Sequence, residues 1–90
     1  MSRRPAYVYL LRCGDRSLYC GWTHDVERRL AQHRAGRAAR YTRSRQPVEL
    51  AWVVELPDAR SARREEARIK RLTRPQKLAL VASAGRAGSP

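Results

Sequence analysis

The sequence predicts one small α/β domain of the α+β type, in which strands and helices occupy separate segments. Three segments are rich in β-branched and aromatic residues and are predicted strands: residues 6–13, 18–22 and 48–56. Three others carry apolar residues at helical spacing: residues 25–35, 58–72 and 75–81. A chain of 90 residues allows one modest core, so residues 5–81 are predicted to form a single domain. The small residues and glycines of residues 82–90 predict a flexible C-terminal tail.

The first two strands are predicted to form a hairpin, because the turn-forming residues 14–17 separate them. Its register decides whether Tyr9 and Tyr19 share a face of the sheet. An odd loop of three or five residues puts them on the same face, and an even loop without a bulge puts them on opposite faces. Both registers are open at this point, and Gly14 is compatible with a bulged three-residue turn.

The helix at residues 25–35 has clear end signals. Thr23 or Asp25 can cap its start, and Gly36 is the natural stop. Its inward face is predicted to consist of Val26, Leu30 and His33. The helical angle places Arg29 at the edge of that face and Arg28 on the opposite side, so Arg29 is expected to look into the protein or a cleft.

Residues 37–46 have no apolar period and are predicted to be a loop. An aromatic residue among arginines suits base stacking beside phosphate contacts. The candidate nucleic-acid-binding residues are Arg37, Arg40, Tyr41, Thr42, Arg43 and Arg45. The alternative is a solvated connection in which Tyr41 packs on the sheet.

The helix at residues 58–72 places an acid on its apolar stripe. Ala62, Glu66 and Ile69 fall on one side at helical spacing, while Glu65 is displaced to the edge. An inward carboxylate needs a cation or strong donors, because its desolvation costs several kcal/mol. The partner is either an arginine or a metal ion, and the sequence leaves this choice open.

The charge balance favours a polyanionic partner. Twenty Lys and Arg residues against eight Asp and Glu give a formal net charge of +12, which is typical of nucleic-acid-binding chains. The sequence predicts no bilayer-spanning segment and no signal peptide, so we expect a cytoplasmic protein in which Cys13 and Cys20 are buried free thiols. Their spacing with His24 and His33 lacks the close ligand pair of a usual zinc site.

Taken together, these motifs resemble the GIY-YIG nuclease superfamily, and most closely its small stand-alone bacterial branch. The resemblance covers residues 5–81 and includes Tyr7-Val8-Tyr9, Tyr19-Cys20-Gly21, Arg29, Tyr41-Thr42-Arg43 and Glu66. It implies a three-stranded antiparallel sheet flanked by about three helices. It also implies endonucleolytic hydrolysis of phosphodiester bonds with one divalent ion, Mg²⁺ or Mn²⁺, on Glu66. The catalytic residues that it implies are Tyr9, Tyr19, Arg29, His33 and Glu66.

DNA is the expected substrate and RNA the alternative, in repair or damage response, and no obligate protein partner is evident. Either tyrosine can orient the attacking water, and His33 can bind phosphate, move a proton or fill the helix–sheet junction. The sequence departs from the superfamily pattern in having Tyr7 in place of Gly, Cys20 in place of Ile, and no Asn. A basic DNA- or RNA-binding protein on the same scaffold, without cleavage, is the competing hypothesis.

Overall fold

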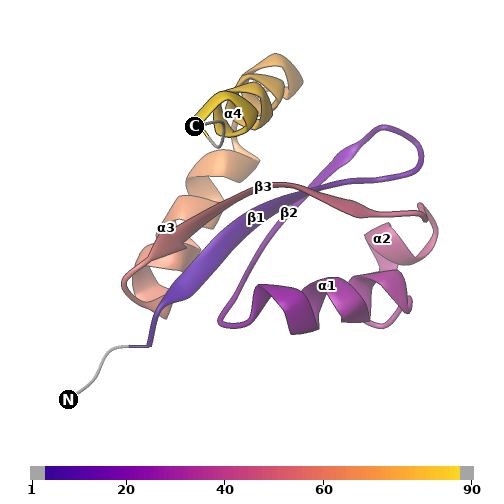
Figure 1. Cartoon of the computed structure of the whole chain (residues 1–90), viewed down its shortest axis with the longest axis horizontal. Coiled ribbons are helices and arrows are strands. Elements are labelled where there is room, and N and C mark those ends of the chain that lie inside the picture. The colour runs from indigo at the N-terminus through magenta and orange to yellow at the C-terminus, as the bar shows by residue number, and fades with distance from the viewer. Residues whose placement is uncertain (1–3, 88–90) are drawn as a thin grey trace.

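A three-stranded antiparallel sheet in the order β2-β1-β3 organises the computed structural model, which describes residues 4–87. The strands are β1 (Ala6–Arg12), β2 (Leu18–Thr23) and β3 (Glu49–Leu56). The helices are α1 (Val26–Arg34), α2 (Arg40–Arg43), α3 (Ala59–Lys70) and α4 (Arg74–Ala87). Helices α1 and α2 lie on one side of the sheet, and α3 and α4 lie on the other (Figure 1). The predicted sheet and its flanking helices are confirmed.

The hairpin register places the two tyrosines on one face. Tyr9 pairs with Gly21, and Leu11 pairs with Tyr19, so residues 13–17 form a five-residue loop. An odd loop keeps residues of equal parity on the same side of the sheet. The residue of this loop with left-handed backbone geometry is Arg16, whose φ is 71°, and Gly14 does not have a positive φ.

Each face of the sheet carries its own hydrophobic core. The first core contains the fully buried Val8, Leu10, Ala62 and Ile69, together with Cys20, beneath α3. The second contains Tyr9, Leu11, Cys13 and Val48, with Leu30, Tyr19 and Tyr41 packed against it. The two cysteines are buried and free, and they belong to opposite faces. Within residues 4–87, no cluster of three or more His, Cys, Asp and Glu side chains could hold a metal ion.

Helix α1 begins and ends where its signals predict. Of the two candidate caps, Asp25 is the one used, and its carboxylate accepts a hydrogen bond from the Arg28 N–H at 3.1 Å. At the other end Gly36 has φ 74°, and its N–H donates to the His33 carbonyl at 3.1 Å. This geometry satisfies the last carbonyls of the helix and turns the chain toward α2.

Two predictions about local structure are corrected. The segment predicted as a loop contains the short helix α2, in which Thr42 is fully buried. Helical spacing alone could not reveal one turn of helix held by tertiary contacts. Helix α4 runs through Ala87, so residues 82–87 of the predicted tail are helical, in keeping with the helix propensity of their alanines. Residues 88–90 of the predicted tail lie outside the described residues. None of the described helices is long and apolar enough to cross a bilayer.

Candidate active site

A chain of hydrogen bonds runs from β1 through α1 to α2. The Tyr9 hydroxyl lies 2.9 Å from His33 Nε2, and His33 Nδ1 lies 2.8 Å from Thr42 Oγ1. Thr42 donates its own proton to the Ala39 carbonyl at 3.2 Å, so its oxygen accepts from His33 Nδ1–H. Nε2 of the neutral ring must then accept from the Tyr9 hydroxyl. The network therefore assigns the tautomer of His33 and the direction of every proton in the chain.

Burial keeps this chain neutral. It raises the pKa of the Tyr9 hydroxyl to about 12, although the charge of Arg29 acts in the opposite direction. Burial, followed by the Arg29 charge, lowers the pKa of His33. Both rings are almost inaccessible, with Tyr9 2% and His33 1% exposed. Direct contact of His33 with a phosphate is therefore blocked in this arrangement, and His33 fills the helix–sheet junction.

Gly21 makes room for the Tyr9 phenol. A Cβ atom at this position would lie 2.5 Å from the Tyr9 hydroxyl oxygen and 2.7 Å from Cζ. The strand passes this close only because the residue has no side chain. A glycine inside a strand pattern is a sequence signal for such close approach, and it was available here without the structure.

Tyr19 and Tyr41 extend the cluster toward the surface. The Tyr19 ring makes an edge contact with His33, with centroids 5.2 Å apart, and lies 5.7 Å from the Tyr41 ring. The guanidinium of Arg45 covers Tyr41 at 3.9 Å from its centroid and forms an ion pair with Asp15 at 2.9 Å. Tyr41 thus packs beside the sheet face, as the alternative interpretation of the basic segment expected.

The basic segment is divided between surface and interior. Arg37, Arg40 and Arg43 are exposed, while Arg45 is held by Tyr41 and Asp15. Thr42 is fully buried and bonded to His33. The prediction that Thr42 contacts nucleic acid is therefore corrected: its side chain is an interior support of the His33 ring.

Glu66 approaches from the other face of the sheet. It lies on α3 between the buried Ala62 and Ile69, and its side chain is 20% exposed. Its partner is neither of the two expected: the carboxylate lies 3.4 Å from Lys70, one turn further along the same helix. After burial, the charge of Glu66 is the next cause that raises the pKa of the Cys20 thiol to about 11. Glu66 therefore lies beside Cys20 of the edge strand β2, whereas the tyrosine cluster lies on the opposite face.

The donor set at Glu66 suits only certain ions. One carboxylate on α3, which packs against β1 and β2, fits a hard ion that keeps several waters and takes further oxygens from a substrate, as Mg²⁺ does. It does not fit Zn²⁺ or Ca²⁺, which need more protein ligands. The residues present thus agree with the ion expected from the resemblance.

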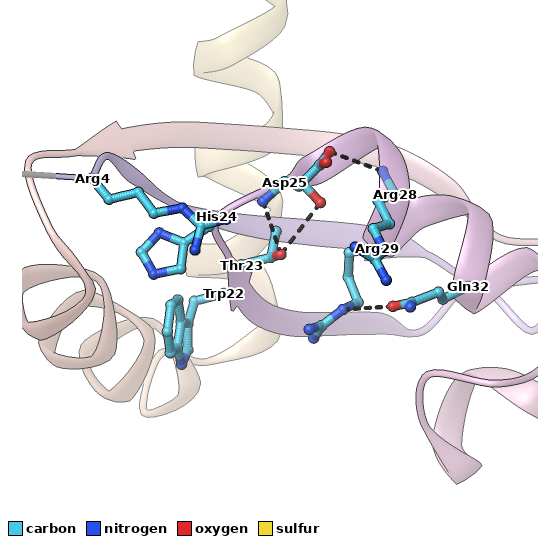
Figure 2. A pocket seen from close by; sticks show the side chains of 8 residues that line it. All are labelled: Arg4, Trp22, Thr23, His24, Asp25, Arg28, Arg29 and Gln32. Atoms are coloured by element: carbon cyan, nitrogen blue, oxygen red, sulfur yellow. Dashed lines mark hydrogen bonds between the residues drawn. The ribbon is translucent and has the colours of Figure 1, made fainter.

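A cavity of about 420 Å³ opens where β2 meets α1 (Figure 2). Arg29 reaches into it and donates from Nε to Gln32 at 3.1 Å. Arg29 thus links the cavity to the Tyr9 cluster, as its place at the edge of the inward face predicted. The sequence patterns did not single out Arg4, Trp22 or Gln32 as site residues, and they considered His24 only as a zinc ligand. Only the alternation of β2 hinted at Trp22, and nothing in the sequence indicated the cavity.

Comparisons with known proteins agree on one family. The model of the GIY-YIG catalytic domain matches residues 5–79. A UPF0213 protein of Nitratidesulfovibrio vulgaris is 53% identical over 79 residues, which cover 88% of this chain and 72% of that protein. A UPF0213 protein of Vibrio cholerae is 49% identical over 91% of this chain and 82% of its own length. The solution NMR structure of a UPF0213 protein from Bacillus halodurans superposes with a TM-score of 0.59 at 42% identity, covering 90% of this chain and 86% of that one.

Proposed function

The chain belongs to the GIY-YIG catalytic domain family, and from that premise we propose that it is a metal-dependent endonuclease that hydrolyses phosphodiester bonds in DNA, in repair or damage response. The observation that carries the proposal is the packing of Tyr9, Tyr19, Arg29 and His33 around one network. Phosphodiester hydrolysis needs an oriented water and a positive donor at the phosphoryl oxygens. The phenols and the guanidinium are groups of these two kinds.

Tyr19 is assigned to the attacking water. It is partly exposed on the edge strand β2, whereas the buried Tyr9 gives its hydrogen bond to His33 and has a pKa of about 12. In the reaction the Tyr19 hydroxyl oxygen accepts a hydrogen bond that orients the water, the water oxygen bonds to phosphorus, and the water's proton passes to solvent. The bond from phosphorus to the leaving oxygen breaks, and that oxygen is protonated by solvent. Tyr9 and His33 then act as positioning residues that hold the Tyr19 ring.

Arg29 and Glu66 are the remaining two residues with proposed catalytic roles. Arg29 belongs to α1 on one face of the sheet, and Glu66 belongs to α3 on the other. Arg29 donates its remaining N–H groups to the phosphoryl oxygens, where negative charge grows toward the transition state. Glu66 would hold a divalent ion, which when bound would supply positive charge to the phosphate. Because β2 is an edge strand, a phosphate at its free edge can meet groups from both faces.

A second function is favoured by one observation. Glu66 and the tyrosine cluster lie on opposite faces, and the Glu66 carboxylate already has Lys70 at 3.4 Å. If these halves do not meet around a substrate, the chain is a basic DNA- or RNA-binding protein without cleavage. The two functions share the fold and the charge and differ at Glu66.

The test is cleavage of labelled DNA and RNA by Glu66→Ala with Mg²⁺ or Mn²⁺. We expect a loss of at least about 100-fold in cleavage rate, with DNA binding unchanged. Glu65→Ala is the matched control, because the Glu65 carboxylate is next to Glu66 in the chain but is paired with Arg68 at 2.8 Å. This variant should cleave as the wild type does. Wild-type protein that binds DNA but never nicks it with either ion would establish the binding function instead.

A further inference from the structure

The cavity between β2 and α1 contains more binding chemistry than hydrolysis of one phosphate needs. It is lined by three arginines, Arg4, Arg28 and Arg29, by the rings of Trp22 and His24, and by Gln32. Its volume of about 420 Å³ falls within the range of about 300–1,000 Å³ that is typical of small-ligand sites. The proposed mechanism uses only Arg29 from this set.

The charges of the cavity favour an anion. The lining of the cavity contains three guanidinium groups and one carboxylate, that of Asp25. This carboxylate caps α1 by accepting a hydrogen bond from the Arg28 backbone N–H. Arg29 donates from Nε to Gln32 and hydrogen-bonds the Tyr9 hydroxyl, which leaves further N–H groups of its guanidinium for a ligand. Guanidinium forks bind phosphate oxygens in pairs, so the cavity suits a phosphate group.

The aromatic wall favours a flat ring beside that anion. Trp22 is partly exposed, and His24 meets it edge to face with centroids 5.4 Å apart. His24 is itself fixed, since its Nδ1–H donates to the Pro5 carbonyl at 2.8 Å. Figure 2 shows the Trp22 ring on one side of the cavity, the Arg29 guanidinium across from it, and His24 and Arg4 along the rim. The Arg63 guanidinium lies over the same ring at 5.9 Å from its centroid, and the part of the indole that lines the cavity is a surface on which a base can stack.

We infer that this cavity binds one unpaired nucleotide of the substrate strand, with its base against Trp22 and its phosphate at Arg4 and Arg28. Arg29 then faces the neighbouring phosphate, which is the one to be cleaved. A base inside a duplex is stacked on both sides and paired at its edge, so it cannot enter. The inference rests on the proposed function for the place of the cut, and it names the substrate class: DNA with an unpaired nucleotide beside the cleavage site.

The experiment measures binding without metal, so that cleavage plays no part. Trp22 and Trp52 are the two tryptophans of the chain, and in a Trp52→Phe background the fluorescence reports Trp22 alone. With EDTA present, duplexes with a short single-stranded overhang, blunt duplexes of the same length, and overhangs that lack bases are titrated into the protein. We expect the overhang to quench the fluorescence and to bind about tenfold tighter than the other two.

Two substitutions with Trp52 kept, measured with EDTA present by the anisotropy of labelled DNA and not by tryptophan fluorescence, separate stacking from packing. Trp22→Leu should remove the overhang preference, while Trp22→Phe, which keeps an aromatic face, should retain most of it. Equal affinity for overhang and blunt duplex, or for overhangs with and without bases, overturns the inference, as does a preference that survives in Trp22→Leu. Quenching by a mononucleotide without any overhang preference also overturns it, because the cavity would then be a site for free nucleotides.

Failure here and failure of the proposed function are distinguishable. Metal-dependent cleavage with no preference for unpaired nucleotides would remove only the cavity's role. A preference that depends on Trp22, in a protein that never cleaves, would keep the cavity's role and remove the endonuclease.

Discussion

His33 shows how a single side chain acquires its role from its partners. Both ring nitrogens are engaged, one by Tyr9 and one by Thr42, and the ring is sealed from solvent. The protonated ring would need a second acceptor, but the Tyr9 hydroxyl already donates its proton toward Nε2. Nearby Arg29 adds a repulsive charge. The fold therefore favours the neutral imidazole.

This preference predicts a loss of stability on acidification. Because the folded-state pKa of His33 lies below the ordinary value of 6.5, the unfolded chain binds the proton first. The stabilisation is present above about pH 6.5 and is lost as the pH falls through the folded pKa. The free energy of unfolding, from urea denaturation at pH 7.5 to 5, should decrease in the wild type and much less in His33→Gln.

His24→Gln is the matched control for this prediction, because His24 lies at the rim of the cavity, outside the buried network. It should keep the wild-type pH dependence. If His33→Gln retained the full decrease, the buried ring would not be its source.

Among the elements, β2 carries the largest part of the site. It supplies Tyr19 and Gly21 to one face, Cys20 and Trp22 to the other, and leads through Thr23 into the cap of α1. As an edge strand it has one side free for a partner, which is where residues from both faces can meet a substrate. The close passage of β2 over the Tyr9 phenol leaves no room for a side chain at Gly21.

That fit predicts the effect of Gly21→Ala. The added methyl would overlap the Tyr9 hydroxyl and push the phenol away from His33, at a cost of about 1–3 kcal/mol in the free energy of unfolding. The displaced phenol should also ionise at a lower pH than its pKa of about 12. Chemical denaturation and an absorbance titration of the tyrosines measure the two effects.

Gly36→Ala serves as the comparison. Its φ of 74° also penalises a side chain, but the new methyl would meet Arg43 Cγ at 3.2 Å and not the site. It should reduce stability and leave the Tyr9 titration in place. Identical titration curves for the two variants would contradict the role assigned to Gly21.

The whole molecule is a strongly positive body, with a formal net charge of +12 on 90 residues. Several acids are already paired with bases, as in the Asp15–Arg45 and Glu65–Arg68 pairs. The exposed arginines around α2 keep their charge available to phosphates. Binding that depends on such contacts releases counterions and weakens steeply with salt.

Salt dependence therefore tests which arginines contact nucleic acid. A plot of log affinity against log salt concentration has a negative slope. The magnitude of this slope should decrease by about 1 in Arg40→Ala, and by the same amount in Arg43→Ala. Arg68→Ala is the control, because the Arg68 guanidinium is held by the Glu65 carboxylate through two hydrogen bonds of 2.8 Å, and its slope should match the wild type. Fluorescence anisotropy with a blunt duplex from 50 to 300 mM salt provides the measurement. Slopes unchanged in both α2 variants would exclude this segment from the interface.

Local signals in the sequence were enough to predict most of the elements of this protein. Alternation indicated the three strands, helical spacing indicated α1 and α3, and short-range capping chemistry indicated Asp25 and Gly36. The inward positions of His33 and Glu66 followed from the same spacing, because a helix repeats at a known angle. These inferences need only the residues within a few positions of one another.

Long-range packing settled what the sequence left open. The parity of the loop at residues 13–17 decided that Tyr9 and Tyr19 share a face. The choice of which helix covers which face put Glu66 opposite the tyrosines and buried Thr42 against His33. The cavity beside Trp22 likewise exists only where β2 and α1 meet. Contacts between segments far apart in the chain leave no local pattern in the residues, so they emerge only when the chain is folded.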